Sequence, residues 1–395
     1  MIGFDEAVEM IAAVARPLGP ERVSLASAHG RVLAEPVVAQ ISSPPADVSA
    51  MDGYVVRDSD LAAIPAELPI AGESFAGTGF EGELPQGACV RIFTGAPVPG
   101  GADRVVIQEV VRRDGNLAFF DHPPGSARHI RRAGSDFARG DTLLPAGRLM
   151  SPRAMVAAAG ADMDHVMAWR RPRLIVLSTG DELVDPGQAA GTSGRIPESV
   201  SYGVAALAIE AGAEFAGTLR LPDDLATMEA AAAEALRDAD VVVVTGGASV
   251  GERDFAKTMF EPAGLELVFS KVAIKPGKPV WIGRAGKTLV VGLPGNPTSA
   301  LVTARLFLVP LLFGLGGRDP NDSLRWRTLP LAEELSPTGE RETFSRGYAD
   351  EAGIRLFGHQ DSSSQKVLAE ATLLVRRVPG NAKVPAGSPV PVLDF

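Results

Sequence analysis

The sequence is poor in cysteine and lysine. It has one cysteine, Cys89, among 395 residues, and only seven of its 38 basic residues are lysines. A single cysteine excludes a disulfide framework and a multi-cysteine metal site within one chain, and it fits a reducing compartment. The five histidines lie far apart and lack the spacing of zinc ligands. Because the net charge is −10, we expect no general affinity for nucleic acid or anionic lipid.

Long apolar runs are also scarce. The best candidates, such as residues 306–315, fall short of the ~20 residues that span a bilayer, and Pro310 and Gly314 interrupt them. The first six residues include two acids and no basic residue, so we expect no signal peptide. We therefore expect a cytoplasmic protein without a membrane partner.

Glycine and proline are abundant by contrast, with 43 glycines and 31 prolines that follow no period. Hydrophobic residues make up 46% of the chain and charged residues 22%, as in ordinary globular proteins. This composition excludes a fibrous or mainly disordered chain and predicts many fixed turns. At roughly 100–200 residues per domain, the length indicates about two to four domains.

The N-terminal part changes its pattern several times. Apolar residues at helical spacing predict helices over 4–16 and 27–33. From about residue 48 to 140, short alternating runs between Gly, Pro and Asp predict a compact β domain. Helical character returns over 141–171, where Pro152 stands at a helix start. We expect the helical segments on either side of the β domain to form one discontinuous unit.

Residues 172–316 alternate strands and helices, which predicts a mostly parallel sheet covered by helices. Within this region, 267–274 and 279–283 are expected to pair around a Pro/Gly loop, and 297–312 to form a helix. After a glycine-rich linker, short strands predict a second β module. The predicted fold class is α/β plus β, with a helical domain at 1–41 plus 141–171, a β-rich insert at 42–140, an α/β domain at 172–317 and a C-terminal β domain at 318–395.

Ligands of such sheets bind at the carboxyl ends of the strands, and three loops there carry candidate chemistry. The first loop, residues 245–254, reads TGGASVGERD. Its paired glycines expose backbone N–H groups that suit an anion, and Asp254 could accept from a hydroxyl or hold a metal. A tight turn with Asp254 as a helix cap explains the loop equally well.

The second loop, residues 271–279, reads KVAIKPGKP and holds three of the seven lysines. Two prolines stiffen it, and holding like charges together is costly without an anion. The alternative is a solvated charge run. The scarcity of lysine elsewhere favours an anion site at Lys271, Lys275 and Lys278.

The third loop, residues 292–299, reads GLPGNPTS and enters a helix at Pro297. Free N–H groups at a helix start favour an anion, although a plain helix start has the same sequence features. Acidic residues follow two further strands, at 181–182 and 223–224. Carboxylates beside phosphate-type sites commonly hold Mg²⁺, and each of these acids could equally be a helix cap.

Two apparent nucleotide motifs fail on their context. Residues 77–82 match GxGxxG but open no helix, so they predict no dinucleotide site. Residues 283–288 end like a P-loop, but Trp281 occupies the position of its first glycine. A hairpin turn is the better interpretation of the second segment.

Taken together, the loops resemble the molybdopterin molybdenumtransferases, the family of MoeA and the gephyrin E domain. The resemblance also includes SAMDGY at 49–54, RIFTGAPVP at 91–99 and STGDEL at 178–183, in the family's order. It covers nearly the whole chain. No single motif would suffice, but several long ones in order make chance agreement very improbable.

The resemblance implies an elongated four-domain enzyme that inserts molybdate into adenylylated molybdopterin and releases AMP, assisted by Mg²⁺. It also implies a homodimer whose active site combines parts of both subunits, with the molybdopterin adenylyltransferase as a partner. By resemblance, the catalytic residues are Asp52, Thr94, Glu182, Asp224, Asp254, Lys271 and Lys275, of which Glu182, Asp224 and Asp254 would hold the metal. The residues expected to bind molybdate and pterin are Gly246, Gly247, Ser249, Lys278, Pro294, Asn296, Pro297, Ser299, Arg346 and Ser363.

The sequence departs from the family at 198–200, where Glu-Ser-Val replaces the usual Asp-Ser-Asn. Because valine at position 200 lacks the amide of the usual asparagine, we expect the contacts with the pterin to differ from those of the family. Two other functions compete with the enzyme. One is a non-catalytic molybdopterin-binding or scaffold protein, which would not need the retained lysines. The other is a general nucleotide-dependent enzyme, which would need a glycine-rich fingerprint at the first helix of the α/β domain.

Overall fold

The computed structural model describes residues 1–246 and 255–395. The chain divides into two compact units. The large unit comprises Met1–Glu21, Gly30–Ala34 and Met167–Phe395, and the small unit comprises Arg22–His29 and Glu35–Val166. The finer division into four domains stays a prediction.

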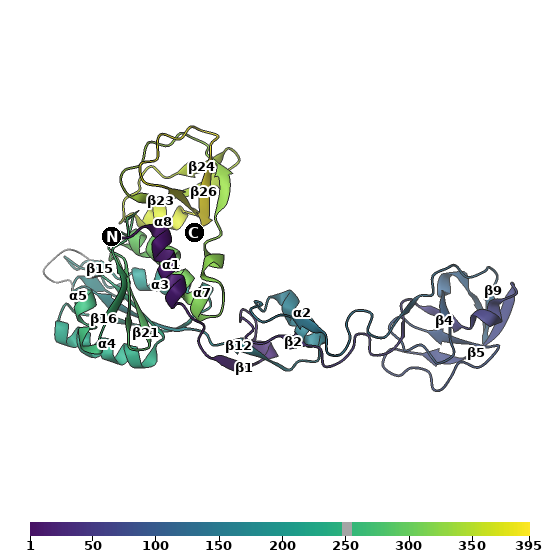
Figure 1. Ribbon diagram of the computed structural model, residues 1–395. Helices are drawn as coiled ribbons and strands as arrows, with labels where there is room; N and C mark the ends of the chain where they lie inside the picture. The colour runs from purple at the N-terminus through teal and green to yellow at the C-terminus, as the bar shows by residue number, and fades with distance from the viewer. Residues whose placement is uncertain (247–254) are drawn as a thin grey trace. The chain divides into compact units, whose positions relative to one another are not determined.

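A six-stranded sheet forms the centre of the large unit (Figure 1). The first four strands in spatial order are parallel, the fifth runs antiparallel to both of its neighbours, and the sixth has the direction of the first four, which confirms the mostly parallel α/β domain. Its strands, in spatial order, are β16 (Glu214–Leu221), β13 (Arg173–Thr179), β17 (Val241–Thr245), β21 (Thr288–Leu293), β20 (Trp281–Ala285) and β18 (Glu266–Ser270).

Helices cover both faces of this sheet because successive strand residues point to opposite faces. In β17, Val241 and Val243 pack in one core cluster, while Val242 and Val244 pack in another. The first cluster includes residues of α1 (Phe4–Val14), α3 (Val200–Glu210), α6 (Pro297–Thr303) and α7 (Val309–Leu315). The second includes residues of α4 (Leu225–Asp238) and α5 (Phe255–Thr258).

One helix among the described residues is long and apolar enough to cross a membrane, and it spans Pro297–Leu315. The helix predicted over 297–312 is confirmed and extends to Leu315, so Pro310 does not end it. A π-helical turn over Ala304–Leu308 comes directly before α7, and the helix continues past the proline. Because 89% of the apolar stretch is buried inside the protein, it has the character of a core helix and is only weak evidence for a membrane span.

The second loop, residues 271–279, which we call the lysine loop, leaves the α/β sheet. Strand β18 pairs with β20, as the sequence predicts for this region, but it ends at Ser270. The following strand β19 (Ile274–Lys275) instead pairs in parallel with β23 of the C-terminal sheet. That sheet contains β19, β23 (Glu342–Asp350), β25 (Leu373–Arg377), β26 (Pro389–Asp394) and β22 (Arg327–Pro330), with β24 (Gly353–Leu356) beside β23 and α8 (Gln365–Glu370) in a connection.

The small unit contains the predicted β domain. Its six-stranded sheet has the order β7 (Arg104–Ile107), β4 (Gly53–Val56), β6 (Cys89–Ile92), β5 (Ala66–Ser74), β9 (Leu117–Phe120) and β8 (Arg112–Asp114). Shorter pairs join β2 (Val37–Val38) to β11 (Thr142–Leu144) and β3 (Val48–Ser49) to β10 (Ile130–Arg131), and α2 (Pro152–Gly160) starts at the predicted proline. The chain also forms β1 (Pro20–Ser24), β12 (His165–Trp169), β14 (Leu183–Val184) and β15 (Ile196–Pro197).

The helix predicted over 27–33 was wrong. The chain makes a 3₁₀ turn at Leu25–Ser27 and then turns at Gly30, which has a φ of +75°. Val32 and Leu33 are buried in extended backbone. The apolar pattern therefore reflects burial of an extended segment rather than a helix face.

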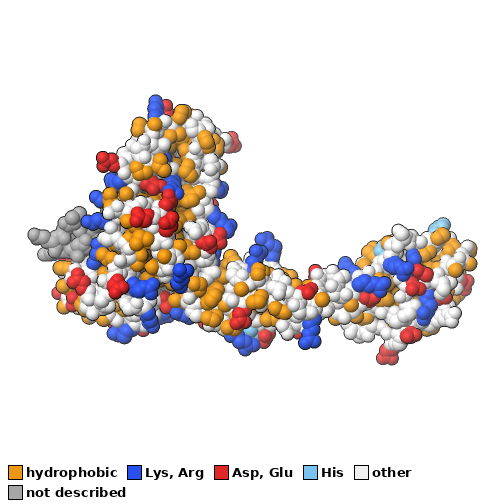
Figure 2. All heavy atoms as spheres, viewed as in Figure 1, with side chains coloured by type: hydrophobic (Ala, Val, Ile, Leu, Met, Phe, Trp, Pro, Cys, Tyr) orange, Lys and Arg blue, Asp and Glu red, His pale blue; other side chains and the backbone are white. Residues whose placement is uncertain are grey.

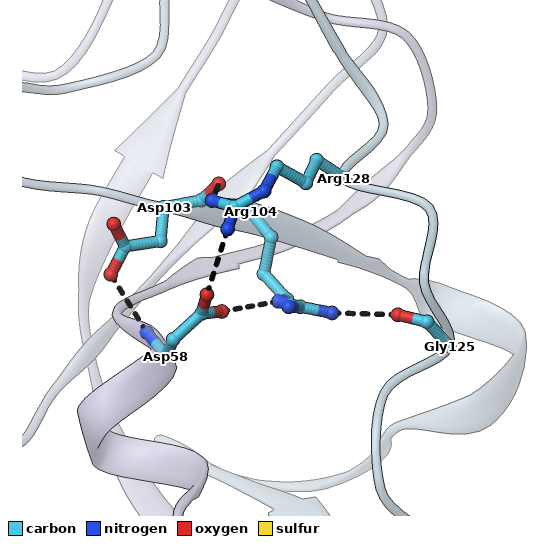
Figure 3. A network of polar contacts seen from close by, with 5 residues as sticks. All are labelled: Asp58, Asp103, Arg104, Gly125 and Arg128. Atoms are coloured by element: carbon cyan, nitrogen blue, oxygen red, sulfur yellow. Dashed lines mark hydrogen bonds and ion pairs between the residues drawn. The ribbon is translucent and has the colours of Figure 1, made fainter.

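A polar network stabilises the β domain of the small unit (Figure 3). The Asp58 carboxylate accepts hydrogen bonds from Arg104 and, at 3.2 Å, from Arg128. Arg104 also donates to the Gly125 carbonyl, and Asp103 accepts from the Asp58 amide. Arg104 lowers the pKa of Asp58 because it stabilises the charged form. On the face shown in Figure 2, charged side chains of both signs lie interspersed.

We expect Asp58→Asn to lower the stability of the small unit by about 1 kcal/mol at pH 7, a small value because the carboxylate is partly exposed. Since the folded-state pKa is lowered, the stabilisation is full above the unfolded-state value of roughly 3.9. It is lost as the pH falls through the folded-state pKa. Calorimetric unfolding of both proteins from pH 7 downward measures this. A difference that stays constant into the acid range would contradict the assignment.

Candidate active site

Four parallel strands of the large unit end at one edge of the sheet. Thr179 of β13 pairs with Leu221 of β16, and Ser178 pairs with Thr245 of β17. Thr245 in turn pairs with Leu293 of β21. The acidic loops and the two glycine-rich loops therefore begin next to one another, as the sequence predicts.

Two of these loops touch through glycines. Gly246 has a φ of +92°, and a Cβ there would lie 2.5 Å from the Thr179 carbonyl oxygen. A Cβ at Gly295 would lie 3.4 Å from the Gly246 Cα. Any larger residue at position 246 would collide with β13, so glycine is required there for packing. The predicted residues Gly247, Ser249 and Asp254 lie outside the described residues.

The carboxylates at this edge have different environments. Asp224 caps α4, since its Oδ2 accepts from the Thr227 amide at 2.9 Å and from the Thr227 hydroxyl at 2.6 Å. These bonds lower the pKa of Asp224. Glu182 is exposed in the neighbouring loop. Within 1–246 and 255–395, no group of three His, Cys, Asp or Glu residues is placed to hold a metal.

The three lysines of the second loop are exposed. Lys275 pairs with Thr343 of β23, and Lys271 has a φ of +68°. Of the ion pairs formed in the part of the chain that the structure describes, none includes Lys271, Lys275 or Lys278. The loop thus presents ammonium groups without a described carboxylate partner.

A cleft of about 860 Å³ lies between this loop and the C-terminal sheet. Lys275, Lys278 and Arg341 line it, together with the segment 336–340, which includes the acidic Glu340. Arg377 also lines it, but its guanidinium donates to Asn381 and to the Ser336 and Ala382 carbonyls. Arg341 donates one hydrogen bond, from Nη1 to the Ile274 carbonyl at 3.4 Å, so Lys275, Lys278 and Arg341 are the cations with donors available to an anion in the cleft.

Arg346 is buried beside the cleft, with none of its surface exposed. Its Nη1 donates to the Thr298 hydroxyl at 3.1 Å and its Nη2 to the Asp361 carbonyl at 3.0 Å, while Nε has no partner among the described residues. Burial lowers the pKa of Arg346 because desolvation disfavours its charge. Gln360, which lines the cleft, bonds to the Arg346 amide and carbonyl.

The third loop joins the C-terminal β module at the same place. The Asn296 side-chain amide donates to the Ser362 hydroxyl at 3.1 Å, and the Thr298 backbone N–H donates to the Ser362 carbonyl. Pro297 is the first residue of α6. Pro294 and Ser299 are buried next to it, and Ser299 is 5% exposed.

The predicted serine of the C-terminal loop bonds within its own loop. The Ser363 hydroxyl and amide both donate to Asp361, and these bonds lower the pKa of Asp361. Ser362, the neighbouring residue, makes the contact with the third loop. Of the predicted residues, Lys275 and Lys278 line the cleft and Arg346 lies beside it, so these three belong to one region of the large unit.

The family departure at 198–200 has a structural explanation. Val200 begins α3 and is 6% exposed within the main core cluster. Glu198 is buried as well, and its carboxylate accepts from the Ser201 amide and hydroxyl. Both side chains thus contribute to the start of α3.

In the small unit, two predicted residues contact each other. The Asp52 Oδ1 accepts from the Thr94 amide at 2.7 Å and from the Thr94 hydroxyl at 2.8 Å. These bonds lower the pKa of Asp52.

Sequence reasoning missed Thr298, Gln360 and Arg341, which touch Arg346 or line the cleft. Ordinary polar residues of this kind give no signal in a single sequence.

Comparisons with known proteins support the resemblance. The family model of the MoeA N-terminal region (domain I and II) matches residues 2–161, and that of the probable molybdopterin binding domain matches 175–314. A molybdopterin molybdenumtransferase of Haemophilus influenzae is 36% identical over 408 residues, which cover 100% of this chain and 99% of that protein. Molybdopterin molybdenumtransferase 2 of Mycobacterium tuberculosis is 36% identical over 409 residues, which cover 100% of this chain and 100% of that protein. The crystal structure of a molybdopterin biosynthesis MoeA protein from Pyrococcus horikoshii has a TM-score of 0.84 at 28% identity, covering 100% of this chain and 99% of its own.

Proposed function

Because the chain belongs to the molybdopterin molybdenumtransferase family, we propose that it inserts molybdate into adenylylated molybdopterin during molybdenum cofactor biosynthesis. Two molybdenum–sulfur bonds form with the dithiolene, and one oxo group leaves as water with the two thiol protons. One water cleaves the phosphoric anhydride, which releases AMP. Full-length relatives with this enzymatic name favour catalysis over the scaffold alternative.

The observation that carries the proposal is the set of cations around the cleft. Lys275 and Lys278 line it without a described carboxylate partner, and Arg346 lies buried behind Gln360 with an unpaired Nε. A buried cation is costly unless an anion compensates it. Molybdate is a small dianion whose oxygens accept hydrogen bonds from several donors at once. Fixed donors of this kind suit a reaction in which charge is positioned rather than carried covalently.

We propose that Mg²⁺ assists the reaction by binding the substrate phosphates. Mg²⁺ commonly uses one or two carboxylates and completes its coordination with water and phosphate oxygens. Glu182 and Asp224 follow adjacent strands and could supply that number, with Asp254 as a third ligand. Asp224 keeps one oxygen for this role, because its capping bonds use only Oδ2.

The assembly is also a proposal. We infer a cytoplasmic homodimer whose active site combines the α/β domain of one subunit with parts of the other, and the molybdopterin adenylyltransferase as the supplier of substrate. The proposed domain boundaries remain 1–41 plus 141–171, 42–140, 172–317 and 318–395. Tungstate is a second oxyanion of the same shape, and competition between the two anions would measure their preference.

Genetic complementation tests the function in the cell. A strain that lacks its molybdopterin molybdenumtransferase should regain molybdoenzyme activity when it expresses this chain. Lys287→Ala, on the turn between β20 and β21, should complement as well as wild type. Stable expression without any recovery, at ordinary and at raised molybdate, would refute the proposed function.

A further inference from the structure

An aromatic stack in the small unit ends on an exposed ring. The rings of Phe75 and Phe93 are 4.6 Å apart and nearly parallel, with an interplanar angle of 10°. The Arg91 guanidinium lies 4.8 Å from the Phe93 ring and 5.1 Å from the Tyr54 ring. Phe75 is 46% exposed although one face of its ring is covered by Phe93. Its other face is therefore open to a ligand.

The stack is held rigidly from below. The buried Arg91 donates to the Gly53 carbonyl at 3.0 Å and to the Gln108 side chain. The Phe93 amide donates to the Ser74 carbonyl, which fixes the two phenylalanine segments side by side. A flat ring that is held in place and exposed on one face can stack against a planar aromatic ligand.

Asp52 lies at the same end of the sheet. It binds Thr94, the residue after Phe93, and Gly95 lies beside Ala76, the residue after Phe75. Both bonds from Thr94 go to Oδ1, so Oδ2 is left to accept from a ligand. The Thr94 bonds also lower the pKa of Asp52, which keeps the carboxylate ionised and purely an acceptor.

We propose that Phe75 and Asp52 bind the pterin ring of the substrate, the ring stacking on Phe75 and its N–H edge facing Asp52. This inference rests on the proposed function and assigns the half of the substrate that the lysine cleft does not. The aminopyrimidinone edge of a pterin presents two adjacent N–H donors, and the remaining Asp52 oxygen, Oδ2, has two lone pairs to accept them. The corresponding edge of adenine presents one donor and one acceptor, so the carboxylate selects the pterin over the adenylyl group.

Steady-state kinetics of AMP release test the stacking contact. Phe75→Ala is expected to raise the KM for adenylylated molybdopterin about tenfold with little change in kcat, in line with the loss of one base-sized stack. Phe75→Tyr should restore the wild-type KM, while Phe75→Leu, which keeps the apolar volume, should not. The matched control is Phe119→Ala on β9, since that ring also packs on a guanidinium, of Arg112, in the same unit.

Binding of two substrate fragments separates this inference from the proposed function. Fluorescence titration of the full-length protein with 6-hydroxymethylpterin should show binding that Phe75→Ala and Asp52→Asn both weaken about tenfold, while AMP binding is unchanged. The assignment would be overturned if Phe75→Ala left the KM for adenylylated molybdopterin unchanged or weakened the binding of AMP alone. It would also be overturned if the Phe75→Ala protein no longer had the oligomeric mass of the wild type. If the wild type releases no AMP but binds pterin through Phe75, the proposed function fails and the pterin site stands.

Discussion

Replacing Lys275 by alanine is expected to lower kcat/KM for molybdate in AMP release by about 10- to 100-fold. The lysine lines the cleft and is held there by the pairing of β19 with β23. A hydrogen bond to a charged group contributes roughly 1.5–3 kcal/mol, which corresponds to this range of rates. The measurement is the rate of AMP release as molybdate is varied at saturating adenylylated molybdopterin.

Lys287→Ala is the matched control for this change. It removes an ammonium group from the turn that leads into β21. This turn lies at the start of the strand, whereas the site lies at its end. Its kcat/KM should equal that of wild type. A Lys275→Ala enzyme with normal molybdate dependence would remove the lysine loop from the reaction.

Replacing Arg346 by methionine is expected to lower activity by about 100-fold or more, while the thermal stability stays the same or rises. The guanidinium is fully buried and its Nε is unpaired, and the Asp361 carboxylate offsets its desolvation only in part, without forming an ion pair with it. Desolvation makes such a charge a cost to folding, and an apolar side chain of similar size removes that cost. Calorimetry gives the stability, and the AMP-release assay gives the activity.

Arg377→Met provides the contrast. Arg377 is also buried and reaches the same cleft, but all of its nitrogens donate to protein acceptors. Its loss leaves several acceptors unpaired, so we expect a loss of stability of about 2 kcal/mol. If Arg346→Met were destabilised like Arg377→Met and kept its activity, Arg346 would be a structural residue.

Much of the site could be predicted because strand ends and turns carry local signals. The valines of β17, the glycines after it and Pro297 at the helix start fix where the loops begin, and the structure aligns those strand ends in register. Family resemblance, rather than local pattern, was needed to single out Asp52 and Arg346. Each lies on a β domain whose residues give no periodic signal of function.

The remaining features depend on contacts between distant residues. Arg346 and Thr298 are 48 positions apart, and nothing in either segment predicts their hydrogen bond. The departure of Ile274–Lys275 from the α/β sheet also depends on a partner strand, β23, much later in the chain. The prediction of a helix over 27–33 failed for a related reason, because the apolar spacing fits a helix while burial holds Val32 and Leu33 in extended backbone.

The most direct test of the account is a single-turnover reaction of the full-length protein with adenylylated molybdopterin, with and without molybdate. The proposal predicts that AMP appears only when molybdate is present and that one molybdenum is incorporated for each AMP released. AMP release at the same rate without molybdate, or no release under either condition, would contradict it.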